Sequence, residues 1–229
     1  MPTTTQNEIA VMKLLTVLAL LLAAWLPPAA AQNARPHTTP VAKPAFVEVM
    51  ADRALLAKIR QGGYVLYLRH GYTDNSRADQ FPDVDLNDCN TQRLLNDQGR
   101  AQMREIGKAL RQAKIPLGEI LVSPMCRTRE SAQLAIGERF TTNEALMYSA
   151  NMTSAEKRPR LEALARLLAA PVPAGSNRLL IAHAPNLADL IGFFVKPEGT
   201  LVVFAPDGPE GFRYLASIPP GRWNELLRP

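Results

Sequence analysis

Short apolar runs alternate with longer amphipathic stretches from Phe46 onward, and this alternation most constrains the fold. The runs cover residues 64–68, 119–122, 178–182 and 201–204, and a further edge strand is expected over 214–218. Runs of this length, bounded by Gly, Pro or polar residues, are typical of buried strands. Helical patterns fall over residues 97–113, 125–137, 153–169 and 185–191. This order predicts a single α/β domain over residues 46–229, a three-layer sandwich with a mostly parallel central sheet and helices on both faces.

The composition fits an ordinary folded enzyme or binding protein. Of 229 residues, 47% are hydrophobic and 21% are charged, which excludes a disordered, collagen-like or coiled-coil chain. Two cysteines are too few for a disulfide scaffold or a four-cysteine zinc site. The net charge of +5 is spread along the chain without a lysine-rich or aromatic-interleaved basic run, so no nucleic-acid partner is expected.

The first 31 residues have the layout of a secretory signal. Lys13 precedes a run over residues 14–26 that is apolar except for Thr16, and prolines and three alanines follow up to Ala31. A run of this length is shorter than the roughly 18–20 residues that span a bilayer. We therefore expect residues 1–31 to be a signal peptide cleaved after Ala31, residues 32–45 to be a flexible Pro-containing linker, and the mature protein to be exported to the periplasm without stable membrane insertion. An uncleaved anchor is the alternative.

Two histidines occupy equivalent places in the predicted sheet. His70 follows the run at 64–68 and Arg69, and His183 follows the run at 178–182. Because ligands of open α/β sheets bind beyond the carboxyl ends of the strands, both side chains are expected at the functional edge. Ser123 follows the run at 119–122, and Arg127 lies four residues further along the chain, where a helix should begin. Free helical N–H groups and guanidinium groups both suit phosphate oxygens, so this edge predicts an anion site.

These residues resemble the signatures of the histidine phosphatase superfamily, the phosphoglycerate-mutase-like enzymes. Residues 69–73, Arg-His-Gly-Tyr-Thr, are similar to the Arg-His-Gly-x-Thr signature of that family. Residues 123–132 resemble its second signature, residues 95–100 resemble its helix-leading segment, and His183 matches its second histidine. The resemblance spans roughly residues 62–195 and implies the fold of that family.

The resemblance also implies roles for the site residues. His70 would be the nucleophile that forms a phosphohistidine, because a neutral imidazole keeps a lone pair near pH 7. Arg69, Arg127 and His183 would bind the phosphoryl group and stabilise its charge in the transition state. The expected partner is a small phosphorylated substrate, and the resemblance implies no metal and no cofactor.

The proton donor is the least defined part of the predicted site. Members of the family commonly use an acidic residue after the second-signature helix, or an aspartate beside the second histidine. Here His183 is followed by Ala184 and Pro185, so the second arrangement is absent. Glu144 falls in the first region and is the candidate catalytic acid, and Asp74, four residues after His70, is the other candidate.

The two cysteines leave two possibilities open. Cys89 lies in the long loop after His70 and Cys126 lies beside Arg127. In an exported protein they would either form one disulfide, which would hold that loop over the pocket, or remain two buried thiols.

Three other functions compete with the exported phosphatase. The same fold could bind a phosphorylated ligand in the envelope without turnover. A phosphosugar mutase is a second alternative, although the loops offer no clear second phosphate site. A metallohydrolase that uses His70, His183 and Asp74 is the third, and it predicts loss of activity with chelators.

Overall fold

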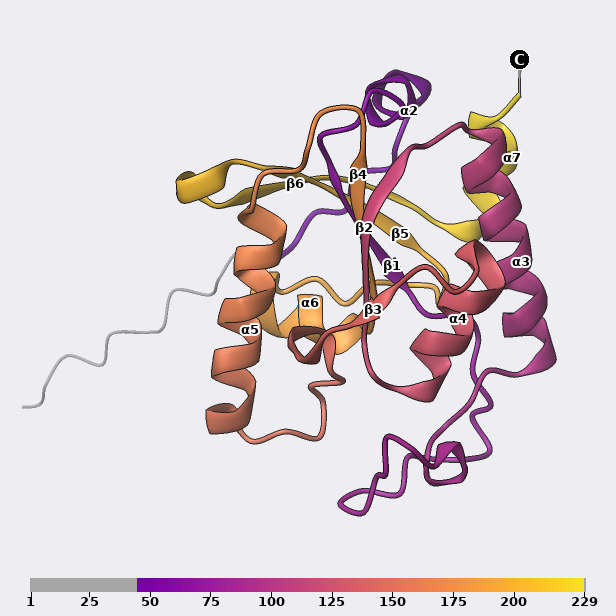
Figure 1. The fold of residues 1–229 in the computed structure, drawn as a ribbon, viewed down its shortest axis with the longest axis vertical. Coiled ribbons are helices and arrows are strands. Elements are labelled where there is room, and N and C mark those ends of the chain that lie inside the picture. Colours follow the sequence, from indigo (N-terminus) through magenta and orange to yellow (C-terminus); the bar gives the residue numbers. More distant parts are fainter. Residues whose placement is uncertain (1–44, 229) are drawn as a thin grey trace, which may run out of the picture. The chain divides into compact units, whose positions relative to one another are not determined.

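The computed structural model describes residues 45–228 and confirms the expected α/β architecture (Figure 1). The predicted signal peptide and all but the last residue of the predicted linker lie outside the described residues. The strands are β1 (Val65–Arg69), β2 (Leu117–Val122), β3 (Thr141–Thr142), β4 (Asn177–Ala182), β5 (Leu201–Pro206) and β6 (Phe212–Ile218). The helices are α2 (Arg53–Ile59), α3 (Asp97–Gln112), α4 (Cys126–Ile136), α5 (Ser154–Ala169), α6 (Ala184–Ile191) and α7 (Trp223–Leu226). In residues 45–228, no helix has the length and apolar character needed to cross a membrane.

The six strands form one mixed, mostly parallel sheet in the order β3-β2-β4-β1-β5-β6. β1 pairs in parallel with β4, and β4 pairs in parallel with β2. β5 runs antiparallel to both β1 and β6. The carboxyl ends of β1, β4 and β2 therefore lie side by side at one edge of the sheet, which is the arrangement that the placement of the histidines required.

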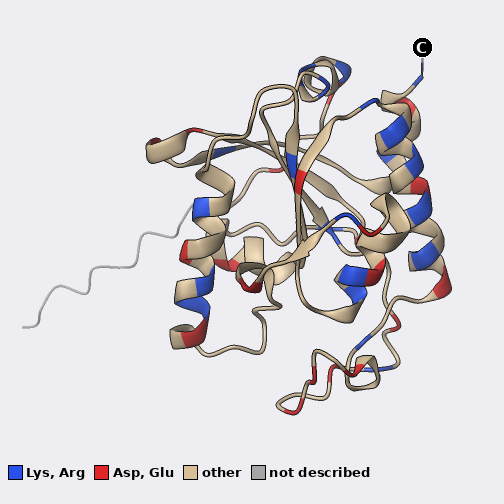
Figure 2. Cartoon of the chain, viewed as in Figure 1, with Lys and Arg blue, Asp and Glu red and all other residues tan. Residues whose placement is uncertain are grey.

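Alternate side chains of the strands pack into two separate cores, one on each face of the sheet. Leu66 and Leu68 of β1 join the core that includes side chains of α2, α3 and α7. Val65 and Tyr67 join the core formed with α5 and α6. Because successive side chains of a strand point to opposite faces, one apolar strand can serve both cores. This division of the apolar side chains produces the three-layer sandwich. Figure 2 shows charged residues along the outer helices α3 and α5.

Local signals define the helices that hold the site. The Asn96 side chain caps α3 by accepting a hydrogen bond from the amide of Gly99. A capping box begins α5, in which the side chains of Thr153 and Glu156 each accept a hydrogen bond from the other residue's amide. Gly107 lets α3 approach α4 closely, since a Cβ at this position would lie 2.1 Å from the carbonyl oxygen of Ala135. This contact fixes α4, whose first turn carries Arg127.

Candidate active site

The register of the sheet brings the two histidines together. Arg69 and Ala182 are paired residues of β1 and β4, so His70 and His183 follow at adjacent positions. Their ring centroids lie 5.3 Å apart, and both side chains are buried. Direct strand pairing therefore places both histidines at the same edge of the sheet.

The hydrogen bonds of His70 define its tautomer. Its Nδ1 lies 2.9 Å from the carbonyl oxygen of Gly71. Because a carbonyl oxygen only accepts, Nδ1 carries the proton and Nε2 keeps the lone pair. Burial, and then the positive charge of Arg127, lower the pKa of His70 well below its usual range. His70 is thus a neutral imidazole with its Nε2 lone pair available for attack.

His183 is held by its backbone and by a serine. The Tyr67 hydroxyl donates to the carbonyl oxygen of His183 at 2.7 Å and accepts from its amide at 3.2 Å. The Nε2 atom of His183 lies 2.8 Å from the hydroxyl oxygen of Ser123 at the end of β2. Nδ1 is buried and has no hydrogen-bond partner among the described residues. Burial, and then the charge of Arg127, lower the pKa of this histidine as well.

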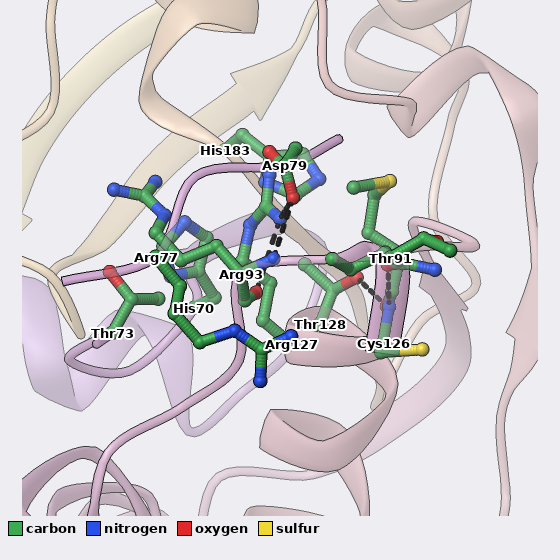
Figure 3. Close-up of polar contacts among 12 residues, drawn as sticks. His70, Thr73, Arg77, Asp79, Thr91, Arg93, Cys126, Arg127, Thr128 and His183 are labelled. Carbon is green, nitrogen blue, oxygen red and sulfur yellow. Dashed lines mark hydrogen bonds and ion pairs between the residues drawn. The ribbon is translucent and has the colours of Figure 1, made fainter. Parts of the chain in front are cut away.

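Arg127 is the central cation of the site. Its side chain is 0% exposed, and its Nη1 forms an ion pair with the carboxylate of Asp79 at 2.9 Å (Figure 3). The guanidinium lies over the ring of Tyr148, 4.9 Å from the centroid, and that ring also packs edge-on against His183. Burial lowers the pKa of Arg127, and the Asp79 carboxylate acts in the opposite direction. Asp79 thus compensates for part of the cost of burying this charge.

Arg69 reaches the site from the end of β1. Its Nη1 donates to the carbonyl oxygen of Val195 at 2.7 Å, and its Nη2 forms an ion pair with Glu198 at 3.1 Å. Glu198 also accepts a hydrogen bond from the hydroxyl of Thr73 at 3.0 Å. The same carboxylate oxygen lies 3.9 Å from Nδ1 of His70. Glu198 therefore connects Arg69 to the segment that follows His70.

The loop over residues 71–95 is fixed above the strand ends. Cys89 and Cys126 form a disulfide, which decides between the two states that the sequence left open. Next to the bridge, the amide of Cys126 donates to the side-chain oxygen of Gln92 at 2.8 Å. The amide of Arg93 donates to the carboxylate of Asp79, also at 2.8 Å. These contacts hold Asp79 against Arg127.

Several buried polar atoms of the candidate site have no hydrogen-bond partner. Nε of Arg69, Nε and Nη2 of Arg127, and Nδ1 of His183 are buried and have no hydrogen-bond partner within residues 45–228. Buried polar atoms in proteins are nearly always hydrogen-bonded, so a group of unpartnered ones indicates a ligand. All three residues are those expected to bind the phosphoryl group, and the arginine donors suit its oxygens.

The two carboxylates expected as proton donors lie apart from these contacts. Glu144 is exposed in a short 3-10 turn, and its carboxylate forms no hydrogen bond or ion pair within the described part of the chain. Asp74 lies in the loop after His70, but its carboxylate accepts from the amide and hydroxyl of Ser76. The described residues also hold no group of three or more His, Cys, Asp or Glu side chains that could bind a metal.

Sequence reasoning missed three residues of the site: Asp79, Tyr148 and Glu198. Each comes from a connecting segment rather than from a strand end. Asp79 is one of several aspartates in its loop, and no local pattern distinguishes it from the others. Only the path of the chain in space brings these side chains to the histidines and arginines.

A family profile and several solved structures resemble this chain. The profile described as histidine phosphatase superfamily (branch 1) matches residues 65–163, which include His70 and Arg127. A search of curated proteins gave no match.

Three of the similar solved structures have low sequence identity to this chain. A putative alpha-ribazole-5'-P phosphatase from Escherichia coli is 15% identical with a TM-score of 0.51, covering 69% of this chain and 97% of its own. A putative phosphohistidine phosphatase SixA from Agrobacterium tumefaciens is 21% identical with a TM-score of 0.47, covering 69% and 99%. The protein histidine phosphatase SixA complexed with tungstate is 16% identical with a TM-score of 0.49, covering 69% and 98%.

The lowered pKa values of His70 and His183 predict that acid destabilises the protein. In the unfolded chain both histidines take up protons near pH 6.5, whereas in the folded protein they stay neutral. The unfolded state therefore binds more protons, and stability falls as the pH drops below about 6.5. At pH 5 the loss reaches up to about 2 kcal/mol for each histidine.

Thermal unfolding between pH 7.5 and 5 in phosphate-free buffer measures this effect. Between pH 7.5 and 5, the melting temperature of the double variant His70→Gln/His183→Gln should fall less than that of the wild type. His37→Gln, in the predicted linker, is the matched control and should follow the wild type. If the melting temperatures of the double variant and the wild type fell equally with pH, the lowered pKa values of His70 and His183 would be contradicted.

Proposed function

We propose that the chain, whose residues 65–163 match the histidine phosphatase superfamily profile, hydrolyses a small phosphomonoester through a phosphohistidine on His70. The observation that carries the proposal is the set of unpartnered buried polar atoms on Arg69, Arg127 and His183, together with the neutral imidazole of His70. Cationic and N–H donors fixed in a buried site stabilise the charge of a transferring phosphoryl group.

The reaction would proceed in two displacements. Nε2 of His70 attacks phosphorus, the bond from phosphorus to the ester oxygen breaks, and the leaving alcohol takes a proton. Water then attacks the phosphohistidine and gives a proton to the group that protonated the alcohol, the phosphorus–nitrogen bond breaks, and inorganic phosphate leaves. The hydrogen bond from Nδ1 to Gly71 orients the ring in both steps and stabilises the charge that the imidazole gains.

We propose Asp79, rather than Glu144 or Asp74, as the proton donor to the leaving alcohol. Its side chain is 8% exposed and touches the phosphoryl-binding Arg127, whereas Glu144 is exposed and has no polar contact with its carboxylate among the described residues. A phosphoryl group bound to Arg127 would lie beside the Asp79 carboxyl group, which would then transfer a proton to the ester oxygen.

The first test is hydrolysis of 4-nitrophenyl phosphate by the purified protein in the presence of EDTA. We expect turnover that resists the chelator and falls on the order of 10³-fold or more in His70→Ala, because the nucleophile is lost. His183→Ala should lower the rate while keeping the same product.

Three outcomes would change the conclusion. Activity that survives in His70→Ala would reject this nucleophile, and activity abolished by EDTA would favour a metal-dependent hydrolase. A folded wild-type protein without turnover would favour the non-catalytic phosphate-binding function.

The role of Asp79 predicts a dependence on the leaving group. An alkoxide needs a proton to depart, whereas 4-nitrophenolate does not. Asp79→Asn should therefore lower kcat/KM for ethyl phosphate by about 10²-fold or more, and for 4-nitrophenyl phosphate much less.

Two matched carboxylate-to-amide variants complete this comparison. Glu144→Gln and Asp74→Asn should keep the wild-type ratio of kcat/KM for the two esters. A selective loss for ethyl phosphate in Glu144→Gln would instead support the acid that the sequence suggested. Equal losses for both esters in Asp79→Asn would limit Asp79 to holding Arg127.

We also propose that the protein is exported to the periplasm after cleavage at Ala31. Support comes from the layout of residues 1–31 and from the Cys89–Cys126 disulfide, since disulfides persist in oxidising compartments. Mass spectrometry of the protein recovered from a periplasmic fraction should give an N-terminus at Gln32. An intact N-terminus in the membrane fraction would favour the uncleaved anchor.

A further inference from the structure

We propose that an apolar pocket beside the phosphoryl site binds the alcohol part of the substrate, and that the substrate is a phosphomonoester of an uncharged aryl or short alkyl alcohol. This inference rests on the proposed function and names the substrate class of the same site.

Two residues belong both to the lining of the pocket and to the phosphoryl site. Asp79 and Tyr148 both line the pocket, and both contact Arg127, through the ion pair and the ring stacking described above. Tyr148 also packs against His183, 5.3 Å between ring centroids. A phosphoryl group held at Arg127 would therefore direct its ester oxygen past Asp79 and into the pocket.

The rest of the lining is mainly apolar. Phe81, Val84, Met125, Met147 and Met152 contribute side chains from three segments of the chain. Methionine side chains adapt their shape to apolar ligands and make favourable contacts with aromatic rings. The cavity volume is about 190 Å³. A dry apolar cavity of about 150 Å³ binds benzene, so this pocket has room for one aromatic ring or a short alkyl chain.

The charges around the pocket disfavour a second anionic group on the substrate. The charged residues that line it, Asp79 and Glu156, are both acidic. The Glu156 carboxylate already accepts from the amide and hydroxyl of Thr153, and these bonds keep its pKa below the usual value. Asn151 is the remaining neutral polar side chain of the lining apart from the Tyr148 hydroxyl. A sugar bearing several hydroxyls would lose hydration here and gain few hydrogen bonds.

The test compares three phosphates of primary alcohols, so that the leaving oxygens are alike: ethyl phosphate, 2-phenylethyl phosphate and glycerol 3-phosphate. Burial of the phenyl group should raise kcat/KM for 2-phenylethyl phosphate about 10- to 100-fold above that for ethyl phosphate. Glycerol 3-phosphate should be no better than ethyl phosphate.

Met152→Ala tests the pocket itself. Met152 is half-buried in the lining, and its truncation should lower the ratio of kcat/KM for 2-phenylethyl over ethyl phosphate several-fold. The ratio is taken on one protein sample, so a fraction of misfolded protein cancels. Met50→Ala is the matched control, because Met50 is 41% exposed and does not line this pocket, and it should leave the ratio at the wild-type value.

The outcomes separate this inference from the proposed function. Turnover of 4-nitrophenyl phosphate that depends on His70, together with equal kcat/KM for ethyl and 2-phenylethyl phosphate, would overturn the pocket and leave the phosphatase intact. A ratio unchanged in Met152→Ala would also overturn it. Absence of turnover with every ester would reject the phosphatase, and the inference with it.

Discussion

The buried charge of Arg127 is the constraint on which the rest of the site depends. A guanidinium removed from water needs anionic or polar partners, and the ion pair with Asp79 supplies one of them. That pair holds the loop after β1 above the strand ends. Burial, and then the same charge, lower the pKa of His70 and His183, so both imidazoles remain neutral. One cation thereby positions the loop, adds to the effect of burial that keeps the histidines uncharged, and retains unpartnered donors for a phosphoryl group.

The main elements of the fold could be predicted because their signals are local. Apolar runs four or five residues long predicted the buried strands, and amphipathic stretches between them predicted the longer helices, whose first residues follow the caps Asn96 and Thr153. Shorter elements escaped prediction. α2 has seven residues with two of them buried, α7 has four residues, and β3 has two. Segments this short complete too few periods for a hydrophobic pattern, and their conformation depends on packing against the sheet.

The site could be predicted only as far as it is built from strand ends. His70, His183, Ser123 and Arg127 follow directly from the parallel pairing of β1, β4 and β2, which the sequence pattern implied. The carboxylates could not be found in this way, because their partners lie far away in the sequence. Glu198, for example, is separated by 129 positions from the arginine of β1 with which it pairs. A loop rich in aspartates gives no local reason to select one of them.

The sheet edge and the loop carry different parts of the proposed function. The strand ends place the nucleophile and the phosphoryl-binding donors, while the loop supplies Asp79, Phe81 and Val84 to the wall beside them. That loop is held at one end by β1 and at the other by the disulfide to Cys126, next to Arg127. Because both ends are fixed, side chains between them can change the pocket without moving His70. Substrate preference and phosphoryl transfer are therefore structurally separable, although Asp79 contributes to both.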